Sequence, residues 1–325
     1  MICNLCGSGE STVIFNNTRL EQHNIRRCTH CGLVFLETGK TQAEIEAFYQ
    51  TEYRKVSTLP VQTPQQHYND PVTKKDIKSQ LEFILNNSEV KGKKVLEIGS
   101  ASGGLLELLR NEGAIVSGIE LNDDYRGYSK SWGMNVFSNP IEHLAKQEKE
   151  YDIIVAFHVL EHFVNPMESI GAIFSCLTPN TSGLFLGEVP NNNEWGISIF
   201  DSNIIKQLHY NPHHYYYFTE KTMAKYLQTN GFSWMQLETI ERYNSLEQLR
   251  RILCETDVKK VIETSVFPKN PEEDLRLRIG DIAEQKYNRL FGKAVNEEKK
   301  GNCLRFVARD LTPYLNTKHH AKEDA

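Results

Sequence analysis

The sequence predicts an α/β protein in which a mostly parallel sheet of seven strands carries helices on both faces. Short apolar runs, typical of buried strands, alternate through the middle of the chain with stretches of helical periodicity. A turn of small residues follows the first of these runs, and the second run ends in a carboxylate. Strands that alternate with helices in this way pair in parallel through helical crossovers, which gives the predicted fold class.

The turn of small residues is the feature around which the rest is organised. Residues 94–98 read as a buried strand and residues 105–109 as the helix that follows it. Between them, Gly99, Ala101 and Gly103 leave room for a ligand to approach the backbone, and the helix start offers unpaired amides. These are the requirements of a nucleotide-like cofactor site, although a glycine-rich turn alone is a weak signal.

The next strand, residues 114–120, ends in Glu120, about twenty residues beyond Gly99, where a carboxylate accepts ribose hydroxyls. Two cofactors fit this arrangement, a dinucleotide and S-adenosylmethionine. The pyrophosphate of a dinucleotide requires G-x-G-x-x-G, but the chain has Gly99, Ala101 and Gly103, with Glu97 inside the strand end. This pattern resembles motif I of the class I S-adenosylmethionine-dependent methyltransferases.

The resemblance implies a Rossmann-like fold and a set of cofactor contacts. In that family the acidic residue of motif I orients the methionyl end of the cofactor, and the residue after the ribose-binding carboxylate lies against the adenine. The family's usual aspartate beside the adenine is replaced here by Pro140, so the backbone of Ile141 or a neighbouring side chain is expected to bind the base. The residues implied as cofactor-binding are Glu97, Gly99, Ala101, Gly103, Glu120, Leu121, Ile141, Phe157 and His158.

Composition places the chain among ordinary globular proteins. Its 325 residues suffice for one large domain with an appendage, or for two domains, and 39% of them are hydrophobic and 24% charged. A formal net charge of -5 gives no overall basic signature and argues against nucleic acid as a partner. No apolar run reaches the length of a membrane span, and the first motif begins at Cys3, so we expect a cytoplasmic protein without a signal peptide.

Two C-x-x-C-G motifs near the start of the chain predict a structural zinc site. Four thiolates close a tetrahedral site and leave no open coordination position, and each glycine permits the tight turn that points amides at sulfur. Two disulfides are the alternative, which a reducing compartment disfavours, and a redox dithiol is a weaker one. The predicted ligands are Cys3, Cys6, Cys28 and Cys31. The remaining cysteines are expected to be small buried hydrophobes: Cys176, Cys254 and Cys303.

These features divide the chain into five predicted parts. The divisions are residues 1–38 as the zinc ribbon, 39–92 as a helical linker or lid, 93–243 and 302–312 as the methyltransferase core, 244–301 as a helical insertion, and 313–325 as a flexible tail. The later strands of the core are expected at residues 135–137, 151–157, 183–191, 233–240 and 303–309. The family's last two strands form a reversed hairpin, so the sheet is mostly, and not wholly, parallel.

Polar side chains gather at the carboxyl ends of the fourth and fifth strands, where ligands bind in open α/β sheets. Phe157 and His158 end the fourth strand, and Glu188 lies near the end of the fifth. The run from His158 to His162 resembles a motif common among small-molecule methyltransferases. Within it we expect Glu161 and His162 to act in capping or packing, although a catalytic divalent ion near Glu161 and Glu188 stays open.

A histidine- and tyrosine-rich segment at residues 208–219 reads as a wall facing the substrate. With the four-cysteine ribbon and the core, it resembles bacterial sugar methyltransferases, including deoxysugar C-methyltransferases, in which a histidine at the place of His214 is the proposed base. The family's neighbouring Glu and Tyr are His213 and Asn211 here, and the chain ends before the family's extra C-terminal domain. These departures favour O-methylation over C-methylation.

The function predicted from the sequence is S-adenosylmethionine-dependent methylation of a hydroxyl on a sugar, nucleotide sugar or surface glycan. A neutral histidine takes the proton of the hydroxyl, and His214 is assigned that role, with His158, His213 and Glu188 orienting it or the acceptor. Three alternatives stay open: C-methylation of a deoxyketosugar nucleotide, methylation of rRNA or tRNA, and a non-catalytic protein that senses the cofactor. The sequence does not predict an oligomeric state.

Overall fold

The computed structural model describes residues 2–19, 22–39, 42–53, 62–147, 150–179, 183–242 and 291–311. The predictions for Cys254, for residues 244–290 of the insertion and for the tail at 313–325 lie outside these residues. The chain forms two compact units: Met1–Thr38 with Val189–Met223 and Leu237–Arg305, and Gly39–Glu188 with Ala224–Gln236 and Phe306–Ala325. We call these the ribbon unit and the cofactor unit. Within the described ranges, no helix has the length and apolar character needed to cross a membrane.

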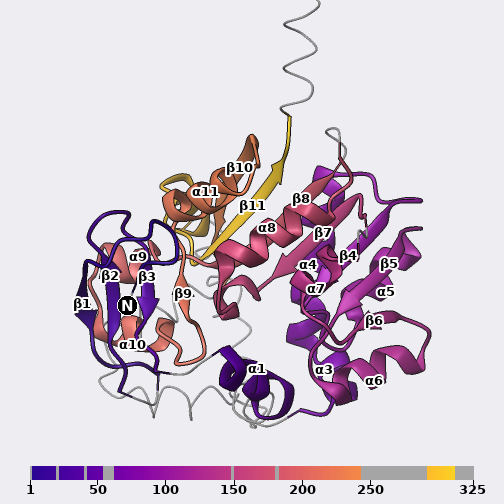
Figure 1. Cartoon of the computed structure of the whole chain (residues 1–325), viewed down its shortest axis with the longest axis horizontal. Helices are drawn as coiled ribbons and strands as arrows, with labels where there is room; N and C mark the ends of the chain where they lie inside the picture. Colours follow the sequence, from indigo (N-terminus) through magenta and orange to yellow (C-terminus); the bar gives the residue numbers. More distant parts are fainter. Residues whose placement is uncertain are drawn as a thin grey trace, which may run out of the picture. The chain divides into compact units, whose positions relative to one another are not determined.

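A four-stranded antiparallel sheet lies in the ribbon unit (Figure 1). Its order is β1 (Ser11–Phe15), β2 (Ile25–Cys28), β3 (Val34–Leu36) and β9 (Tyr216–Tyr217). The three N-terminal strands belong to the predicted ribbon. The fourth was not predicted, because a two-residue strand has no periodicity and its pairing of Tyr217 with Val34 joins distant parts of the chain.

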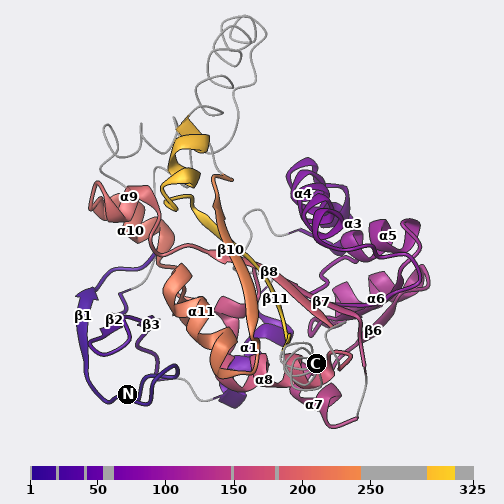
Figure 2. The same ribbon diagram turned by 90° about the horizontal axis from the view of Figure 1, so that it is seen from above.

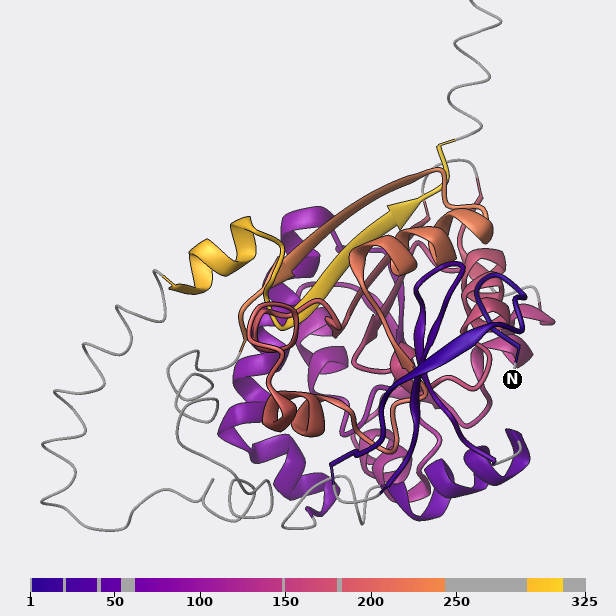
Figure 3. The same cartoon turned by 90° about the vertical axis from the view of Figure 1, so that its left-hand side faces the viewer.

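The main sheet has seven strands, as the sequence predicts. Their order is β10-β11-β8-β7-β4-β5-β6, and β10 and β11 run side by side in Figure 3. β4 pairs in parallel with both β5 and β7, and parallel pairing continues from β5 to β6 and from β7 to β8. The bounds are β4 (Lys94–Ile98), β5 (Ile115–Ile119), β6 (Asn135–Phe137), β7 (Ile153–Phe157), β8 (Leu184–Pro190), β10 (Trp234–Ile240) and β11 (Cys303–Arg309).

Helices cover both faces of this sheet. Val95 and Leu96 point to opposite faces of the central strand β4, yet both are completely buried. The bounds are α1 (Gln42–Thr51), α3 (Pro64–Asn69), α4 (Pro71–Asn87), α5 (Gly104–Asn111), α6 (Asp123–Ser131), α7 (Ile141–Ala145), the 3-10 helix η1 (Leu160–His162), α8 (Pro166–Cys176), α9 (Trp195–Ser198), α10 (Asn203–His209) and α11 (Glu220–Thr229). The structure therefore has the predicted Rossmann-like α/β fold.

Helix α4 is longer than the segment 77–85 that its apolar periodicity suggests. It begins where the side chain of Asp70 accepts a hydrogen bond from the amide of Thr73 (2.8 Å). The same periodicity places Leu85 on the apolar face of the helix, but Leu85 is 39% exposed, whereas Phe83 is buried in the core. The buried stripe follows i, i+4, i+7 spacing and leaves Leu85 at its margin. Helices α3, α4 and α5 lie next to one another (Figure 2).

Candidate functional site

The turn between β4 and α5 adopts the conformation that its small residues allow. Gly99 and Gly103 have φ of 76° and 81°, and Ala101, between them, has φ of 45°. The amides of Gly99 and Ser100 both donate to the carbonyl of Ile119 (2.9 Å each), which ties the turn to the end of β5. A Cβ atom at Gly99 would lie only 3.1 Å from Val159 Cγ2. Position 99 therefore requires glycine for two reasons, its positive φ and the lack of space for a side chain.

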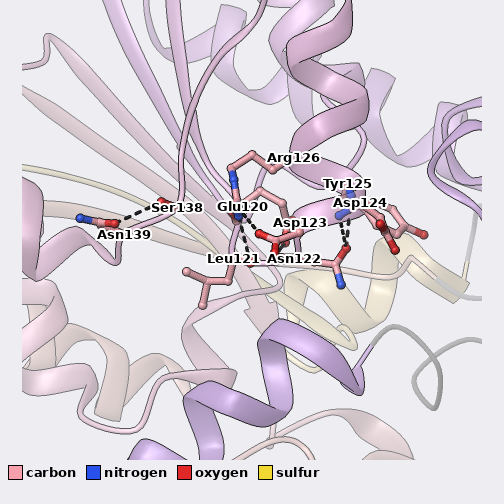
Figure 4. Close-up of polar contacts among 9 residues, drawn as sticks. All are labelled: Glu120, Leu121, Asn122, Asp123, Asp124, Tyr125, Arg126, Ser138 and Asn139. Atoms are coloured by element: carbon pink, nitrogen blue, oxygen red, sulfur yellow. Dashed lines mark hydrogen bonds and ion pairs between the residues drawn. The ribbon is translucent and has the colours of Figure 1, made fainter.

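Glu120, directly after β5, is built into this turn. One carboxylate oxygen accepts from the amide of Ala101 and the other from the amide of Asn122, both at 2.9 Å. Arg126 donates to the carbonyls of Glu120 (2.9 Å) and Leu121 (3.0 Å), which fixes the loop at the start of α6 (Figure 4). The carboxylate predicted from the spacing thus lies beside the glycine turn, and half-buried Leu121 follows it.

Glu97, inside the end of β4, is buried, and its Oε2 has no hydrogen-bond partner among the described residues. Burial, helped by the negative charge of Glu120, raises the pKa of Glu97 from its ordinary value of 4.5 to about 8. A buried carboxyl group with an unmet oxygen is costly unless a ligand completes it. The sulfonium and ammonium charges of S-adenosylmethionine suit this position, so the residues present fit that cofactor.

Part of the predicted lid packs on the glycine turn. His67 Nδ1, from α3, lies 2.9 Å from Ser102 Oγ within the turn, and the hydroxyl of Tyr68 donates to Glu107 of α5 (2.5 Å). The hydroxyl of Tyr125 donates to the carbonyl of Gln62 (3.1 Å). The contact of His67 was not predicted, because no spacing in the sequence relates residues 67 and 102.

His158 follows β7 with a left-handed backbone, φ 53°, which is uncommon for any residue other than glycine. Its Nε2 lies 2.7 Å from Glu188 Oε1, and its Nδ1 lies 3.7 Å from Glu161 Oε1. Both carboxylates are 1% exposed, whereas a quarter of the histidine side chain is accessible. Strained backbone held by buried charged groups is typical of functional sites.

Of the two residues expected to act in capping or packing in this region, His162 does pack against its neighbours. Glu161 was expected to cap or pack a helix, but it faces His158, and its Oε2 has no partner within the described part of the chain. His162 packs against α1, where the hydroxyl of Tyr49 lies 2.8 Å from Nδ1 and that of Tyr53 lies 3.4 Å from Nε2. The i, i+3 spacing of His158 and Glu161 was the available signal for their contact.

The remaining predicted cofactor residues occupy the same unit. Ile141 is buried at the first position of α7, directly after Pro140. The ring of Phe157 packs at its edge against Phe83, 6.5 Å between centroids, and both belong to the hydrophobic core. Of the four residues predicted to be catalytic, His158 and Glu188 lie in the cofactor unit.

His213 and His214 lie in the ribbon unit, directly after α10. The side chain of Asn211 accepts from the amide of His213, and the carbonyl of Asn211 accepts from the amide of His214, both at 3.0 Å. Both histidines are half-buried, and the ring of His214 lies 6.1 Å from that of Tyr217. The segment is therefore an ordered turn that joins α10 to β9.

The four N-terminal cysteines also gather in the ribbon unit. Their sulfur atoms all lie within 4.8 Å of one another, and Cys3 Sγ–Cys31 Sγ and Cys6 Sγ–Cys28 Sγ are each 3.5 Å. None of them forms a disulfide, which excludes the disulfide alternative in this structure. Gly7 and Gly32 have φ of 74° and 79°, as expected for the tight turn after each motif. The donor set and spacing fit a tetrahedral metal ion.

Comparison with known protein families shows the family of the chain. The model of a family described as a methyltransferase domain matches residues 67–237, more than half of the chain. The chain belongs to the S-adenosylmethionine-dependent methyltransferases. The matched range contains the glycine turn, Glu120 and the pair His158–Glu188 of this methyltransferase.

Curated relatives carry the name ubiquinone biosynthesis O-methyltransferase. The methyltransferase is 27% identical to one from Aromatoleum aromaticum over 191 residues, which cover 56% of this chain and 81% of the relative. It is 30% identical to one from Coxiella burnetii over 118 residues, 34% of this chain and half of the relative's length. Both names refer to ubiquinone biosynthesis and not to sugars.

Solved structures of methyltransferases also resemble the chain. A structure of an S-adenosylmethionine-dependent methyltransferase from Archaeoglobus fulgidus is 20% identical, covers 73% of this chain and 94% of its own, and has a TM-score of 0.48. A magnesium protoporphyrin IX methyltransferase from Synechocystis is 14% identical, covers 64% and 95%, and has a TM-score of 0.45.

Proposed function

We propose that the methyltransferase methylates a hydroxyl oxygen of a small molecule, and that this hydroxyl belongs to a sugar, a nucleotide sugar or a surface glycan. The observation that supports O-methylation is His158, held after β7 between the buried carboxylates of Glu188 and Glu161. A sugar hydroxyl is too weak an acid to ionise near neutral pH, so its methylation requires a base. A histidine backed by a carboxylate is such a base.

The cofactor would be held by the turn after β4. In this proposal Glu120 accepts the ribose hydroxyls, Leu121 and Ile141 flank the adenine, and Glu97 with the turn residues Gly99, Ala101 and Gly103 holds the methionyl part. Phe157, a member of the hydrophobic core, would support the cofactor-binding residues from below the site. When bound, S-adenosylmethionine supplies a methyl group on a positively charged sulfur. The small residues of the turn are suited to this because they admit the ligand next to the backbone.

The proton of the acceptor hydroxyl is assigned to a histidine. An ionised Glu188 only accepts hydrogen bonds, so Nε2 of His158 carries the hydrogen at this contact and Nδ1 carries the lone pair. Nδ1 then takes the proton, and the resulting positive charge is stabilised by Glu188 and by Glu161, 3.7 Å away. His214 is the competing base, as its position in the sequence suggests, and His213 would then orient it.

The names of the relatives favour a second acceptor, a phenolic hydroxyl of a ubiquinone precursor. A phenol ionises far more readily than an alcohol, so it needs the histidine less. The two acceptors therefore differ in how strongly turnover depends on the base.

We also propose that Cys3, Cys6, Cys28 and Cys31 bind a structural Zn²⁺. Four sulfur ligands fill a tetrahedral site and leave no position for a substrate, so the ion would stabilise the ribbon and take no part in methyl transfer. The mutual approach of the four sulfurs supports this assignment.

The test uses a radiolabelled methyl donor with a panel of nucleotide sugars, free glycans and 3,4-dihydroxybenzoate. We expect label in a sugar, and we expect His158→Gln to lower kcat by about 100-fold or more, the usual contribution of a general base, with unchanged cofactor affinity by calorimetry. Exposed His143 provides the matched control, and His143→Gln should be silent. A loss in His214→Gln instead of His158→Gln would move the base to His214. Label only in the phenol would replace the sugar as acceptor, and no label in any compound would refute O-methylation.

A further inference from the structure

A hollow of about 540 Å³ lies in the ribbon unit. Residues 13–17, at the end of β1 and just beyond it, form one wall. Asn203 and Gln207, about one turn apart on the same face of α10, form the other. Both walls belong to the same compact unit. A hollow of this volume is large enough for a small ligand.

The two walls are fixed to each other by contacts between distant parts of the chain. The backbone amide of Arg19 donates to the carbonyl of Tyr210 (3.0 Å), and Nη2 of Arg19 donates to the carbonyl of Leu208 (2.8 Å). The ring of Phe15 packs against that of Tyr210, with 5.6 Å between centroids. The hollow therefore exists before a ligand binds, which lowers the entropic cost of binding.

The polar side chains that line the hollow are all carboxamides, those of Asn16, Asn17, Asn203 and Gln207. The side chains of the three asparagines form no hydrogen bond with any described residue, whereas that of Gln207 donates to a backbone carbonyl of the opposite wall. Among the described residues that line the hollow, none is charged. The neighbouring Lys206 forms an ion pair with an aspartate of its own segment.

This lining indicates the chemistry of the ligand. A carboxamide donates and accepts hydrogen bonds, and so does each hydroxyl of a sugar. Val13, which is 47% exposed, and Phe15 add apolar surface for the C–H groups of a sugar ring. A phosphate or carboxylate would find no cation among the lining residues, and a purely apolar ligand would cover the amides without pairing them. An uncharged carbohydrate fits both kinds of surface.

We propose that the ribbon unit binds an uncharged carbohydrate in this amide-lined hollow. The site is separate from the pair His158–Glu188, which belongs to the cofactor unit. Binding there requires neither the methyl donor nor the proposed base, so the inference does not depend on the proposed O-methylation. It gives the methyltransferase a means of holding a glycan independently of methyl transfer.

The first arm of the test measures carbohydrate binding to the full chain by calorimetry, without S-adenosylmethionine. The probes are neutral hexasaccharides of glucose, mannose, galactose and N-acetylglucosamine. At least one should bind to the wild type. Asn17→Ala and Asn203→Ala should each weaken that binding about three- to tenfold, the effect of losing one hydrogen bond. Asn86→Ala, at an exposed asparagine of α4, is the matched control and should bind as the wild type does.

No binding of any of the four probes, or the same affinity in both hollow variants as in the wild type, would overturn the inference. The second arm replaces the neutral probes with hexagalacturonate and with inorganic phosphate. Both should bind more weakly than the best neutral hexasaccharide, and tighter binding of either would show a site for anions instead.

The third arm measures thermal unfolding of the same variants without a ligand. Neither Asn17 nor Asn203 bonds through its side chain to a described residue, so both variants should unfold at the temperature of the wild type. A lower unfolding temperature in both, with an unchanged Asn86→Ala, would assign the two side chains a structural role and contradict the proposed site.

Discussion

At the scale of single residues, Glu97 and Glu120 show how two carboxyl groups at one turn acquire different properties. Glu120 accepts two backbone hydrogen bonds, whereas Oε2 of Glu97 has no partner among the described residues. Burial beside Glu120 raises the pKa of Glu97 to about 8, so its carboxyl is mostly protonated at neutral pH in the cofactor-free protein. A cation placed beside it favours the ionised form, so binding should release a proton.

The affinity for S-adenosylmethionine is therefore expected to rise with pH between about 6 and about 8, by at most tenfold per unit for one released proton. Calorimetry in two buffers of different ionisation enthalpy measures the proton release. Glu97→Gln, which cannot ionise, should remove the pH dependence. The same affinity at both ends of this range in the wild type would contradict the expected role of Glu97.

The raised pKa of Glu97 should also make the stability of the cofactor-free protein depend on pH. Its folded pKa of about 8 exceeds the ordinary value of 4.5, so between these two values the unfolded chain has lost a proton that the folded chain retains. The contribution of Glu97 to the free energy of unfolding is therefore present below pH 4.5 and declines as pH rises through about 8. Denaturant titrations at several pH values should show that the free energy of unfolding falls with pH more steeply in wild type than in Glu97→Gln. The same pH dependence in both proteins would refute the prediction.

The sequence was informative about residues whose role depends on local spacing. Glu120 and the small residues of the turn could be assigned because the requirements of the turn are local, and the structure brings Glu120 to the amide of Ala101. The contacts of His67 with Ser102 and of His158 with Glu188 depend on how separate elements pack. No spacing along the chain encodes such a contact. His158 and Glu188 could therefore be named from the sequence as candidate site residues, but the contact between them could not be predicted.

At the scale of elements, the alternation of strands and helices was enough to predict the sheet. The closing strand Cys303–Arg309 and the short strand Asn135–Phe137 have the predicted bounds. Periodicity failed where a segment is short or partly exposed, as in β9 and at Leu85 of α4. In those places tertiary pairing, and not the local pattern, decides the structure.

The turn from β4 to α5 should be sensitive to substitution of its glycines. At Gly103, φ is 81° and a Cβ would lie 3.0 Å from Ser129 Oγ, so Gly103→Ala should destabilise the fold by about 1–2 kcal/mol and weaken cofactor binding. Gly127→Ala is the control, because a Cβ there meets nothing within 4 Å and the residue lies inside α6. It should raise stability by about 0.5–1 kcal/mol in urea unfolding. Equal effects of the two variants would show that the turn is not constrained as described.

At the scale of the whole molecule, the chain passes more than once between its two compact units, so neither unit is a continuous segment. The predicted ribbon of residues 1–38 supplies the cysteines and three strands, while β9 comes from the segment that also carries His213 and His214. The zinc ribbon could be predicted from the sequence because its four cysteines are close in the chain. Its pairing with β9 joins residues that are distant in the sequence, so it could not be predicted.

Loss of the proposed zinc should affect the ribbon unit and spare the cofactor turn. Cys28→Ser is expected to abolish metal binding, measured as zinc per chain, and to make residues 1–38 sensitive to protease, with affinity for S-adenosylmethionine within about threefold of wild type. Cys176→Ser, at a buried cysteine outside the cluster, is the control and should retain the metal. Stoichiometric zinc in Cys28→Ser would exclude the four-cysteine site.

The pairing of β3 with β9 has a consequence for biosynthesis. The edge of β3 stays open while the chain is being made, because its partner strand, Tyr216–Tyr217, leaves the ribosome only after most of the cofactor-binding segment. The cysteine motifs can capture metal early, but the N-terminal sheet reaches its final number of strands late. A fragment that stops before Tyr216 should expose that edge and self-associate, so strand β3 is translated well before it is fully protected from aggregation.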